Sequence, residues 1–379
     1  MTGAPSSAYV HVPFCQRRCA YCDFTTYAGI LPLAGSYFDA VRREIALDRE
    51  GVPLPPALST VYFGGGTPSL VPEREIAATM RSLSDAFGFA LDLEASIEVN
   101  PGTLRPGAAE VWRDSGINRV SVGVQALDDG LLASLDRIHT AEEAEAAFAE
   151  LRRSGFVNLS ADLMLGLAGQ SVADVVDAVD RVVSFGAVHV SFYSLTVEPG
   201  TPIALRYPDG KGLPEDDEER ALYEAALGAL SRNGLAQYEI SSAARPGCRC
   251  RHNQVYWEAK PYYGFGAGAH AYVDGIRRGN LTGVEAYIRA MQAHGTAEES
   301  RETIDRAEEM AEVMLLGLRM NDGISRGEFM ARFGETVDAV FGERIEPLVR
   351  EGLLDDSDGH LRPTRKGIDF SNAISRAFL

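Results

Sequence analysis

The amino-acid sequence predicts an α/β fold in which a parallel sheet, or a partial (β/α)6 barrel, is followed by a small, mostly helical domain. Three observations predict this fold. From Tyr9 to Arg232, short apolar segments alternate with longer amphipathic ones, as in the β/α units that build parallel sheets. Polar residues or glycines stand at the end of each apolar segment. From Glu298 onward, closely spaced helical segments replace the alternation.

Six short segments are predicted as strands because their β-branched and aromatic residues suit a buried sheet. They are residues 9–12, 61–63, 96–99, 120–124, 159–165 and 188–195. Six amphipathic segments are predicted as helices that cover this sheet. They are residues 36–49, 72–87, 105–114, 140–153, 172–185 and 215–232. Pro72 and Thr140 favour helix N-termini, so they fix where the second and fourth helices begin.

The ends of the predicted strands carry an unusual set of polar residues and glycines. In chain order these are Cys15, Gly64-Gly65-Gly66-Thr67, Glu98 with Asn100, Gln125, Asp162, and Tyr193 with Ser194. A polar group in a buried strand is costly unless it is paired or functional. Folds of β/α units bind their ligands at the carboxyl ends of the strands. The sequence therefore predicts a polar, extended ligand across these ends.

Three of the five cysteines lie within the run Cys15-Gln-Arg-Arg-Cys19-Ala-Tyr-Cys22, on a loop that leaves the first strand. A structural zinc site usually needs four Cys or His ligands. Three thiolates can instead hold a [4Fe–4S] cluster and leave one iron open for a ligand. We therefore predict that Cys15, Cys19 and Cys22 bind such a cluster. A zinc knuckle, or three simply buried cysteines, is the alternative.

The spacing C-x3-C-x2-C, with Tyr21 before the third cysteine, resembles that of the radical S-adenosylmethionine (SAM) enzymes. In that superfamily the open iron binds SAM, whose reductive cleavage yields a 5′-deoxyadenosyl radical. Two runs, Tyr9-Val-His-Val-Pro-Phe-Cys15 and Phe63-Gly-Gly-Gly-Thr-Pro-Ser69, resemble the oxygen-independent coproporphyrinogen III oxidase group. The resemblance implies a SAM site made by Tyr9, Gly64, Gly65, Gly66, Thr67, Glu98, Gln125, Arg137 and Asp162.

Taken without the resemblance, the two glycine-rich runs are weak signals. Gly64-Gly65-Gly66 permits close backbone approach, but no Gly-Lys-Ser/Thr follows, so it is not a Walker phosphate loop. Gly264-Phe-Gly-Ala-Gly268 lacks the strand–helix context of a dinucleotide site. We predict a close-packed turn for it.

A second motif, His252-Asn253-Gln-Val-Tyr256-Trp257, follows a loop that contains Pro246-Gly247. It resembles the His-Asn-x-x-Tyr-Trp signature of the HemW-type haem chaperones, relatives of the oxidase that bind haem and transfer it to acceptor proteins. The resemblance implies a loop on which His252 ligates haem iron while Tyr256 and Trp257 form an aromatic wall. Chemistry alone favours core aromatics and a hydrogen-bonding histidine. Cys248 and Cys250 are candidates for a further cluster ligand, but either would block the open iron.

The predicted organisation has three parts: a barrel core at residues 1–235, a connecting region at 236–297 with the second motif, and a C-terminal domain at 298–379. An amphipathic helix is expected at 303–320, then short helices and a small hairpin. This part resembles the C-terminal domain shared by the coproporphyrinogen oxidase group, which is built like a winged helix.

Composition limits the partners. A formal net charge of −18 argues against binding nucleic acid, which needs a basic face. No apolar run is long enough to span a bilayer, and Met1 to Ala8 lack the pattern of a signal peptide. Clustered cysteines in odd number indicate intracellular ligand chemistry. We expect a cytoplasmic protein; peripheral membrane contact and a homodimer stay open.

Three functions compete: a HemW-type haem chaperone, an active coproporphyrinogen III oxidase, and another radical SAM enzyme. The oxidase motif resembles C-x3-C-x2-C-x-C, whereas Phe24 stands at its last position here. The oxidase also carries an additional N-terminal segment, whereas eight residues precede Tyr9 in this sequence. Together with His252 to Trp257, these differences favour a chaperone that binds haem, SAM and a [4Fe–4S] cluster.

Overall fold

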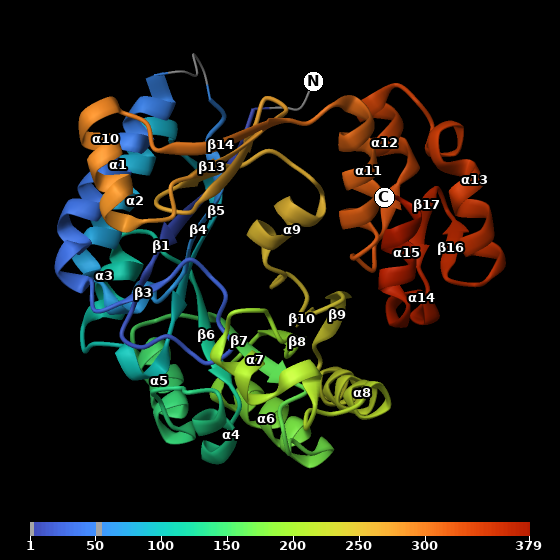
Figure 1. The fold of residues 1–379 in the computed structure, drawn as a ribbon, viewed down its shortest axis with the longest axis horizontal. Helices are drawn as coiled ribbons and strands as arrows, with labels where there is room; N and C mark the ends of the chain where they lie inside the picture. Colours follow the sequence, from blue (N-terminus) through green and yellow to red (C-terminus); the bar gives the residue numbers. More distant parts are fainter. Residues whose placement is uncertain (1–3, 51–54) are drawn as a thin grey trace.

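The computed structural model describes residues 4–50 and 55–379. Residues 1–3, which belong to the predicted barrel core and to the segment tested for a signal peptide, lie outside the described residues. A large sheet with helices along its outer side forms the first body, and a smaller unit of helices and short strands lies beside it (Figure 1). None of the helices in the described ranges combines the length and apolarity needed to cross a lipid bilayer.

The large sheet has nine strands in the order β11-β1-β4-β5-β6-β7-β8-β10-β9. Six neighbouring strands are parallel: β1 (Ser7–Val12), β4 (Leu58–Gly65), β5 (Phe89–Val99), β6 (Arg119–Gln125), β7 (Asn158–Leu165) and β8 (His189–Ser194). At one edge β10 (Ser242–Ala244) and β9 (Ala236–Glu239) continue it antiparallel. At the other edge β11 (Tyr263–Phe265) pairs in parallel with β1. Within the described residues, the two edge strands β11 and β9 are not paired with each other. The sheet is therefore an open, partial barrel, which confirms the predicted (β/α)6 architecture.

One main helix follows each parallel strand and packs on the outer face of the sheet. These are α1 (Ala34–Glu50), α2 (Glu73–Phe87), α3 (Ala108–Asp114), α5 (Ala141–Arg153), α6 (Val172–Phe185) and α8 (Asp216–Arg232). Short helices α4 (Asp129–Ser134) and α7 (Pro202–Arg206) lie between them. Thr140 caps α5 through the backbone N–H of Glu143, and Pro72 directly precedes α2, so both predicted helix starts are confirmed.

The two faces of the sheet differ because successive side chains of a strand point to opposite sides. In β5, Ala95, Ile97 and Val99 are buried under the outer helices. Glu94 and Glu98 have the opposite parity and point to the inner face, where the sheet curves around a short helix, α9 (Arg251–Trp257) (Figure 1). Burying the outer apolar side chains stabilises the fold by roughly 1.5–3 kcal/mol each. The inner face is left to polar groups.

Two local predictions in the connecting region need correction. The run Gly264–Gly268, predicted as a close-packed turn, turns only over residues 266–268, because Gly264 and Phe265 belong to strand β11 (Tyr263–Phe265), which pairs in parallel with β1. A Cβ on Gly264 would lie 1.8 Å from the carbonyl oxygen of His270, so this glycine is required by the close approach of a neighbouring strand. The run His252 to Trp257 does not lie on a loop but makes up most of α9.

The rest of the connecting region forms a small antiparallel sheet of β12 (His270–Val273), β13 (Ile276–Asn280) and β14 (Glu298–Thr303), with α10 (Val284–His294) packed on α1. Strand β14 lies at the predicted start of the C-terminal domain, yet it pairs with β13. The three-part division of the chain therefore stays a prediction.

The C-terminal unit has its own hydrophobic core, which runs from Met310 to Phe378. Its elements are α11 (Arg306–Gly317), β15 (Ile324–Ser325), α12 (Arg326–Phe333), α13 (Val337–Arg350), β16 (Leu354–Ser357), β17 (His360–Pro363), α14 (Arg365–Asp369) and α15 (Ser371–Ala377). The order α-β-α-α-β-β of the first six confirms the predicted winged-helix-like form. Ion pairs of Arg220 with Asp369 and of Arg365 with Glu224 dock the unit on α8.

Candidate functional site at the carboxyl ends of the strands

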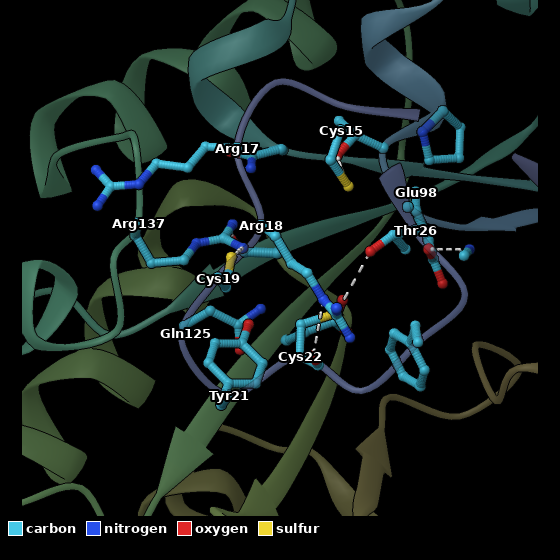
Figure 2. Close-up of a pocket in the computed structure, with 18 of the residues that line it drawn as sticks. Cys15, Arg17, Arg18, Cys19, Tyr21, Cys22, Thr26, Glu98, Gln125 and Arg137 are labelled. Carbon is cyan, nitrogen blue, oxygen red and sulfur yellow. Dashed lines mark hydrogen bonds between the residues drawn. The ribbon is translucent and has the colours of Figure 1, made fainter. Parts of the chain in front are cut away.

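The cysteine loop lies between two very short paired strands, β2 (Phe14–Cys15) and β3 (Tyr27–Ala28). The backbone N–H of Ala20 donates to the carbonyl of Leu135 at 3.0 Å, which ties the loop to the end of α4. Figure 2 shows Cys15, Cys19 and Cys22 facing the same space. The three half-buried thiols line one cavity of about 760 Å³, which we call the cysteine cavity.

Each thiol has a polar neighbour. The Thr67 hydroxyl donates to Sγ of Cys15 at 3.5 Å, and Nη1 of Arg137 donates to Sγ of Cys19 at 3.3 Å. The Thr26 hydroxyl lies 4.0 Å from Sγ of Cys22. Burial raises the pKa of Cys15, while the bond from Thr67 lowers it. Donors of this kind favour thiolates, the form that binds metal.

The arrangement of the thiols bears on the kind of centre that they could hold. No group of three or more His, Cys, Asp or Glu side chains in residues 4–50 and 55–379 is arranged to hold one metal ion. A zinc knuckle, the alternative, would need its ligands around one centre. Thiols spread around a cavity suit the corners of an iron–sulfur cluster. Neither Cys248 nor Cys250 lines this cavity.

The three glycines at the end of β4 allow close contacts that a side chain would prevent. A Cβ on Gly64 would meet the ring of Tyr62 at 2.9 Å and Oε1 of Glu98 at 3.0 Å. Gly65 has φ +111°, and its Cβ would lie 2.4 Å from the ring of His11. Gly66 packs against the backbone of β1. Gly65, Gly66 and Thr67 line the cysteine cavity, whereas Gly64 lies behind Glu98 and does not.

Two carboxyl groups, both partly buried, face the cysteine cavity. Glu98 accepts hydrogen bonds from the backbone N–H of Gly65 and the hydroxyl of Tyr62, both at 3.0 Å. Burial and the nearby Asp162 raise the pKa of Glu98 to about 7. Burial also raises the pKa of Asp162, which accepts from the Ser121 hydroxyl at 3.0 Å. A cation in the cavity would stabilise both carboxylates, since opposite charge favours the ionised form.

Arg137 and Gln125 close the other side of the cavity (Figure 2). Nη2 of Arg137 donates to the carbonyl of Gly123 at 2.7 Å, and its buried Nε has no hydrogen-bond partner among the described residues. Gln125 has φ +66° and accepts from the Tyr193 hydroxyl at 3.0 Å. An unpaired buried donor is costly, so Arg137 is a group that a polar ligand or ordered water would satisfy.

The cysteine cavity thus unites ten of the predicted site residues: Cys15, Cys19, Cys22, Gly65, Gly66, Thr67, Glu98, Gln125, Arg137 and Asp162. Arg17, Arg18 and Thr26 also line it and were not among the predicted site residues. The two arginines stand between the first two cysteines, at positions that the C-x3-C spacing leaves unspecified, and nothing local marks Thr26. Tyr9 does not reach this cavity.

A second cavity of about 920 Å³ adjoins the first, and we call it the tyrosine cavity. Its lining residues are Tyr9, His11, Asp23, Phe24, Thr25, Gly65, Glu98, Tyr256, Tyr262, Gly268 and His270. Phe24, Gly65 and Glu98 line both cavities. Whatever occupies the second cavity therefore lies next to an occupant of the first.

His252 lies inside the partial barrel, with 1% of its surface exposed. Its Nδ1 is 2.8 Å from the Thr60 hydroxyl, and its Nε2 is 2.9 Å from the Tyr256 hydroxyl. Its ring stacks on that of Tyr62, with 5.2 Å between centroids. Burial lowers the pKa of His252 to about 3, so the imidazole is neutral. Both ring nitrogens are occupied by protein partners.

The N-terminus of α9 is held by Glu94. Its carboxylate accepts from the backbone N–H groups of His252 at 3.0 Å and Arg251 at 3.1 Å. The thiol of Cys250, at the helix N-cap, lies 3.8 Å from the same carboxylate, and burial raises its pKa to about 11. These contacts fix α9 against the inner face of the sheet.

The three predicted haem residues point to different places. His252 lines no described cavity, and Tyr256 faces the tyrosine cavity. Trp257 lines a third cavity of about 1420 Å³ between α9 and the C-terminal unit, where the guanidinium of Arg319 lies 4.5 Å from its ring centroid. The predicted common aromatic wall is therefore not assembled in this structure.

Comparisons with known proteins agree with this geometry. Residues 9–182 match the radical SAM superfamily, and residues 304–370 match the HemN C-terminal domain. The heme chaperone HemW of Bacillus subtilis is 34% identical and covers 98% of this chain and 99% of its own length. The heme chaperone HemW of Mycobacterium tuberculosis is 36% identical, covering 100% of this chain and 96% of its own.

Among solved structures, the coproporphyrinogen III oxidase HemN from Escherichia coli, a radical SAM enzyme, superposes with a TM-score of 0.86. The alignment covers 99% of this chain and 90% of that one, at 23% identity, and so shows a shared fold. The full-length similarity to HemW proteins at more than 30% identity is the stronger relationship. This chain belongs to the HemW family of the radical SAM superfamily.

Proposed function

We propose that this chain is a haem chaperone that holds a [4Fe–4S] cluster and SAM, and transfers haem to acceptor proteins. Membership in the radical SAM superfamily implies the cluster and SAM as cofactors. Haem is proposed because the HemW relatives are heme chaperones. The single observation that carries the proposal is the convergence of three thiols, two carboxyls and Arg137 on one cavity at the carboxyl ends of the strands.

Cys15, Cys19 and Cys22 would hold the cluster, which would supply an iron without a protein ligand and one-electron chemistry toward SAM. Thr67 and Arg137 would donate to the bound sulfurs as they donate to the thiols here, at 3.5 Å and 3.3 Å. These donors orient the ligands and offset their negative charge. Arg18 donates to the carbonyl of Cys22 at 3.1 Å and keeps the loop closed.

The remaining residues of the cysteine cavity would bind SAM. Glu98 and Asp162 offer carboxylates to its cationic groups, and Gly65, Gly66 and Thr67 offer backbone at close range. Gln125 and the unpaired Nε of Arg137 offer polar contacts on the opposite side. Gly64 would act by letting Glu98 approach, because a side chain there would collide with that carboxyl group.

Tyr9 would act indirectly. Nε2 of His11 lies 2.8 Å from the carbonyl of Thr25, an acceptor, so Nε2 carries the proton and donates. Nδ1 of His11 is then an acceptor, and the Tyr9 hydroxyl donates to it at 3.0 Å. Through His11, Tyr9 supports Thr25 and hence the loop that bears the cysteines.

We propose the tyrosine cavity as the haem site. Its aromatic lining suits a planar macrocycle, and Tyr256 brings the second motif to its wall. His252 would hold the hydroxyl of Tyr256 in place. We further propose haem-acceptor proteins as partners and a cytoplasmic location, with no role in nucleic-acid binding.

Electron paramagnetic resonance of the anaerobically reconstituted, reduced chain tests the first half of the proposal. We expect the signal of a reduced [4Fe–4S] cluster whose g values change when SAM is added. A cluster signal that SAM leaves unchanged would contradict an open iron in the cysteine cavity. Hemin titration of the same sample tests the second half.

A further inference from the structure

His270 is an exposed imidazole at the wall of the tyrosine cavity. It stands at the first position of β12, directly after the glycine-rich run. Neither of its ring nitrogens is hydrogen-bonded to a residue in the ranges 4–50 and 55–379. Imidazole nitrogens are the commonest protein ligands of haem iron in globins and peroxidases. This nitrogen pair is therefore available for a metal without any loss of existing contacts.

The other histidines near the cavities differ from His270 in this respect. Both ring nitrogens of His252 are occupied, by Thr60 and Tyr256. Both ring nitrogens of His11 are occupied as well, by Tyr9 and Thr25. To bind iron, either ring would have to leave buried partners, at a cost of about 1–3 kcal/mol for each group left unpaired.

Glycines in the backbone around His270 make room for its imidazole ring. A Cβ on Gly279 of β13 would lie 2.9 Å from Cε1 of His270, so the imidazole lies directly over a bare glycine. On the other side, a Cβ on Gly268 would lie 2.8 Å from the side chain of Thr25. Gly279 thus leaves room for the ring of His270, and Gly268 lets the segment before β12 approach the cysteine loop.

Aromatic rings form the rest of the cavity wall. The rings of Tyr256 and Tyr262 meet edge to face with centroids 4.8 Å apart, and Tyr9 lies beside them. Phe24, which follows the last cysteine by two positions, has 61% of its surface exposed at this place. Its ring lines both cavities, so a porphyrin in the tyrosine cavity could pack one face against it.

We propose that His270 is the protein ligand to haem iron in the tyrosine cavity, with His252 as a positioning residue that acts through Tyr256. This inference rests on the proposed haem-chaperone function. The haem then lies next to the occupant of the cysteine cavity, across Phe24 and Glu98.

The test is a titration of the full-length, cluster-reconstituted chain with hemin, followed in the Soret region and by electron paramagnetic resonance of the ferric haem. Three variants are compared with the wild type: His270→Ala, His252→Ala and His360→Ala. His360 is the matched control, because it lines the third cavity beside Trp257 and offers a competing imidazole. Cluster absorbance in each sample reports whether the chain is folded.

We expect His270→Ala to lose the histidine-ligated spectrum and to bind hemin about tenfold or more weakly, the scale seen when a metal's ligand shell is altered. Free imidazole should restore the spectrum of this variant. His360→Ala should keep both spectrum and affinity. His252→Ala should keep histidine ligation while its affinity falls, because Tyr256 loses its anchor.

The proposal would be overturned if His270→Ala kept the wild-type spectrum and affinity. It would also be overturned if free imidazole restored the spectrum of His252→Ala or His360→Ala and did not restore that of His270→Ala. If cluster absorbance shows that His270→Ala is not folded, His270→Gln with imidazole rescue gives the same decision. If the wild-type chain binds no hemin, the haem-chaperone function itself is overturned. This outcome is distinct from a failure of the His270 assignment, because it is seen in the chain without any substitution.

Discussion

Nδ1 of His252 lies 2.8 Å from the hydroxyl of Thr60. Thr60 belongs to β4, and its side chain points into the partial barrel, away from the outer helices. Since Nε2 is paired with the Tyr256 hydroxyl, the His252 side chain links the sheet to α9. The main role of His252 is therefore to hold α9 against the barrel. Of the motif's residues, Tyr256 is the one that lines the tyrosine cavity.

This relationship predicts a cost in stability for Thr60→Val. The substitution keeps the shape of the side chain and leaves Nδ1 of buried His252 unpaired, so we expect the free energy of unfolding to fall by about 1–3 kcal/mol. Denaturant unfolding of the chain measures it. Thr303→Val, on the exposed strand β14, is the matched control and should change little. If both variants changed the free energy of unfolding equally, the contact between Thr60 and His252 would not stabilise the chain.

Cys19→Ser should abolish the iron–sulfur cluster, because a serine hydroxyl does not replace a thiolate as a soft ligand. Iron and sulfide analysis after anaerobic reconstitution measures the loss. Cys248→Ser should retain wild-type iron content, since Cys248 does not line the cysteine cavity. Iron bound in equal amount by Cys19→Ser would refute the assignment of the cysteine loop.

Glu98→Gln should weaken SAM binding by about tenfold to a hundredfold, the usual worth of a hydrogen bond to a charged partner. Equilibrium binding of SAM to the reconstituted chain gives the figure. The matched control is Glu94→Gln, which alters a buried carboxyl of the same strand outside the cysteine cavity. If both variants bind SAM equally well, Glu98 does not face its cationic group.

The same carboxyl predicts a pH dependence. Burial raises the pKa of Glu98 to about 7, so in the free protein it is protonated below that pH. The carboxylate that a cationic ligand needs forms as pH rises, and SAM affinity should increase from about pH 6 to about pH 8. The effect of Glu98 on the free energy of unfolding changes with pH in the opposite direction. Because the pKa of Glu98 is higher in the folded chain than in the unfolded one, its stabilising contribution is fully present below the unfolded pKa and is lost as pH rises through about 7. A flat affinity profile in the wild type would contradict the prediction, and Glu98→Gln should show one.

Gly65→Ala should destabilise the chain by more than Gly200→Ala. Both glycines have positive φ, +111° and +84°, so each alanine carries a backbone cost of about 1–2 kcal/mol. A Cβ on Gly65 also collides with the ring of His11 at 2.4 Å, whereas nothing lies within 4 Å of one on Gly200. We expect the collision to add about 1–3 kcal/mol and to reduce cluster retention. Equal unfolding midpoints for the two variants would show that His11 can move away freely.

The parts of the fold that could be predicted are those with a repeated local pattern. Six apolar segments and six amphipathic ones are long enough to show their period, and capping residues such as Thr140 mark their ends. The residues at the strand ends could be predicted to meet because parallel strands bring their carboxyl ends to one side. Nine of these strand-end residues do line one cavity.

What could not be predicted depends on contacts between distant segments. Helix α9 has seven residues and no apolar period of its own, and its place is fixed by Glu94, more than 150 residues away along the chain. The three-residue strand β11 is defined by its neighbours β1 and β12. His270 carries no local signal at all, because only the folded chain shows that its ring faces a cavity and lacks a partner.

The most direct test of the central claim is an anaerobic titration of the reconstituted, SAM-loaded chain with hemin, followed optically, with coproporphyrinogen turnover assayed on the same sample. We expect stoichiometric hemin binding and no decarboxylation of coproporphyrinogen. Formation of protoporphyrinogen without hemin binding would contradict this expectation. The chain would then be an oxidase, and Phe24, two positions after the last cysteine of the motif, would not distinguish the two functions.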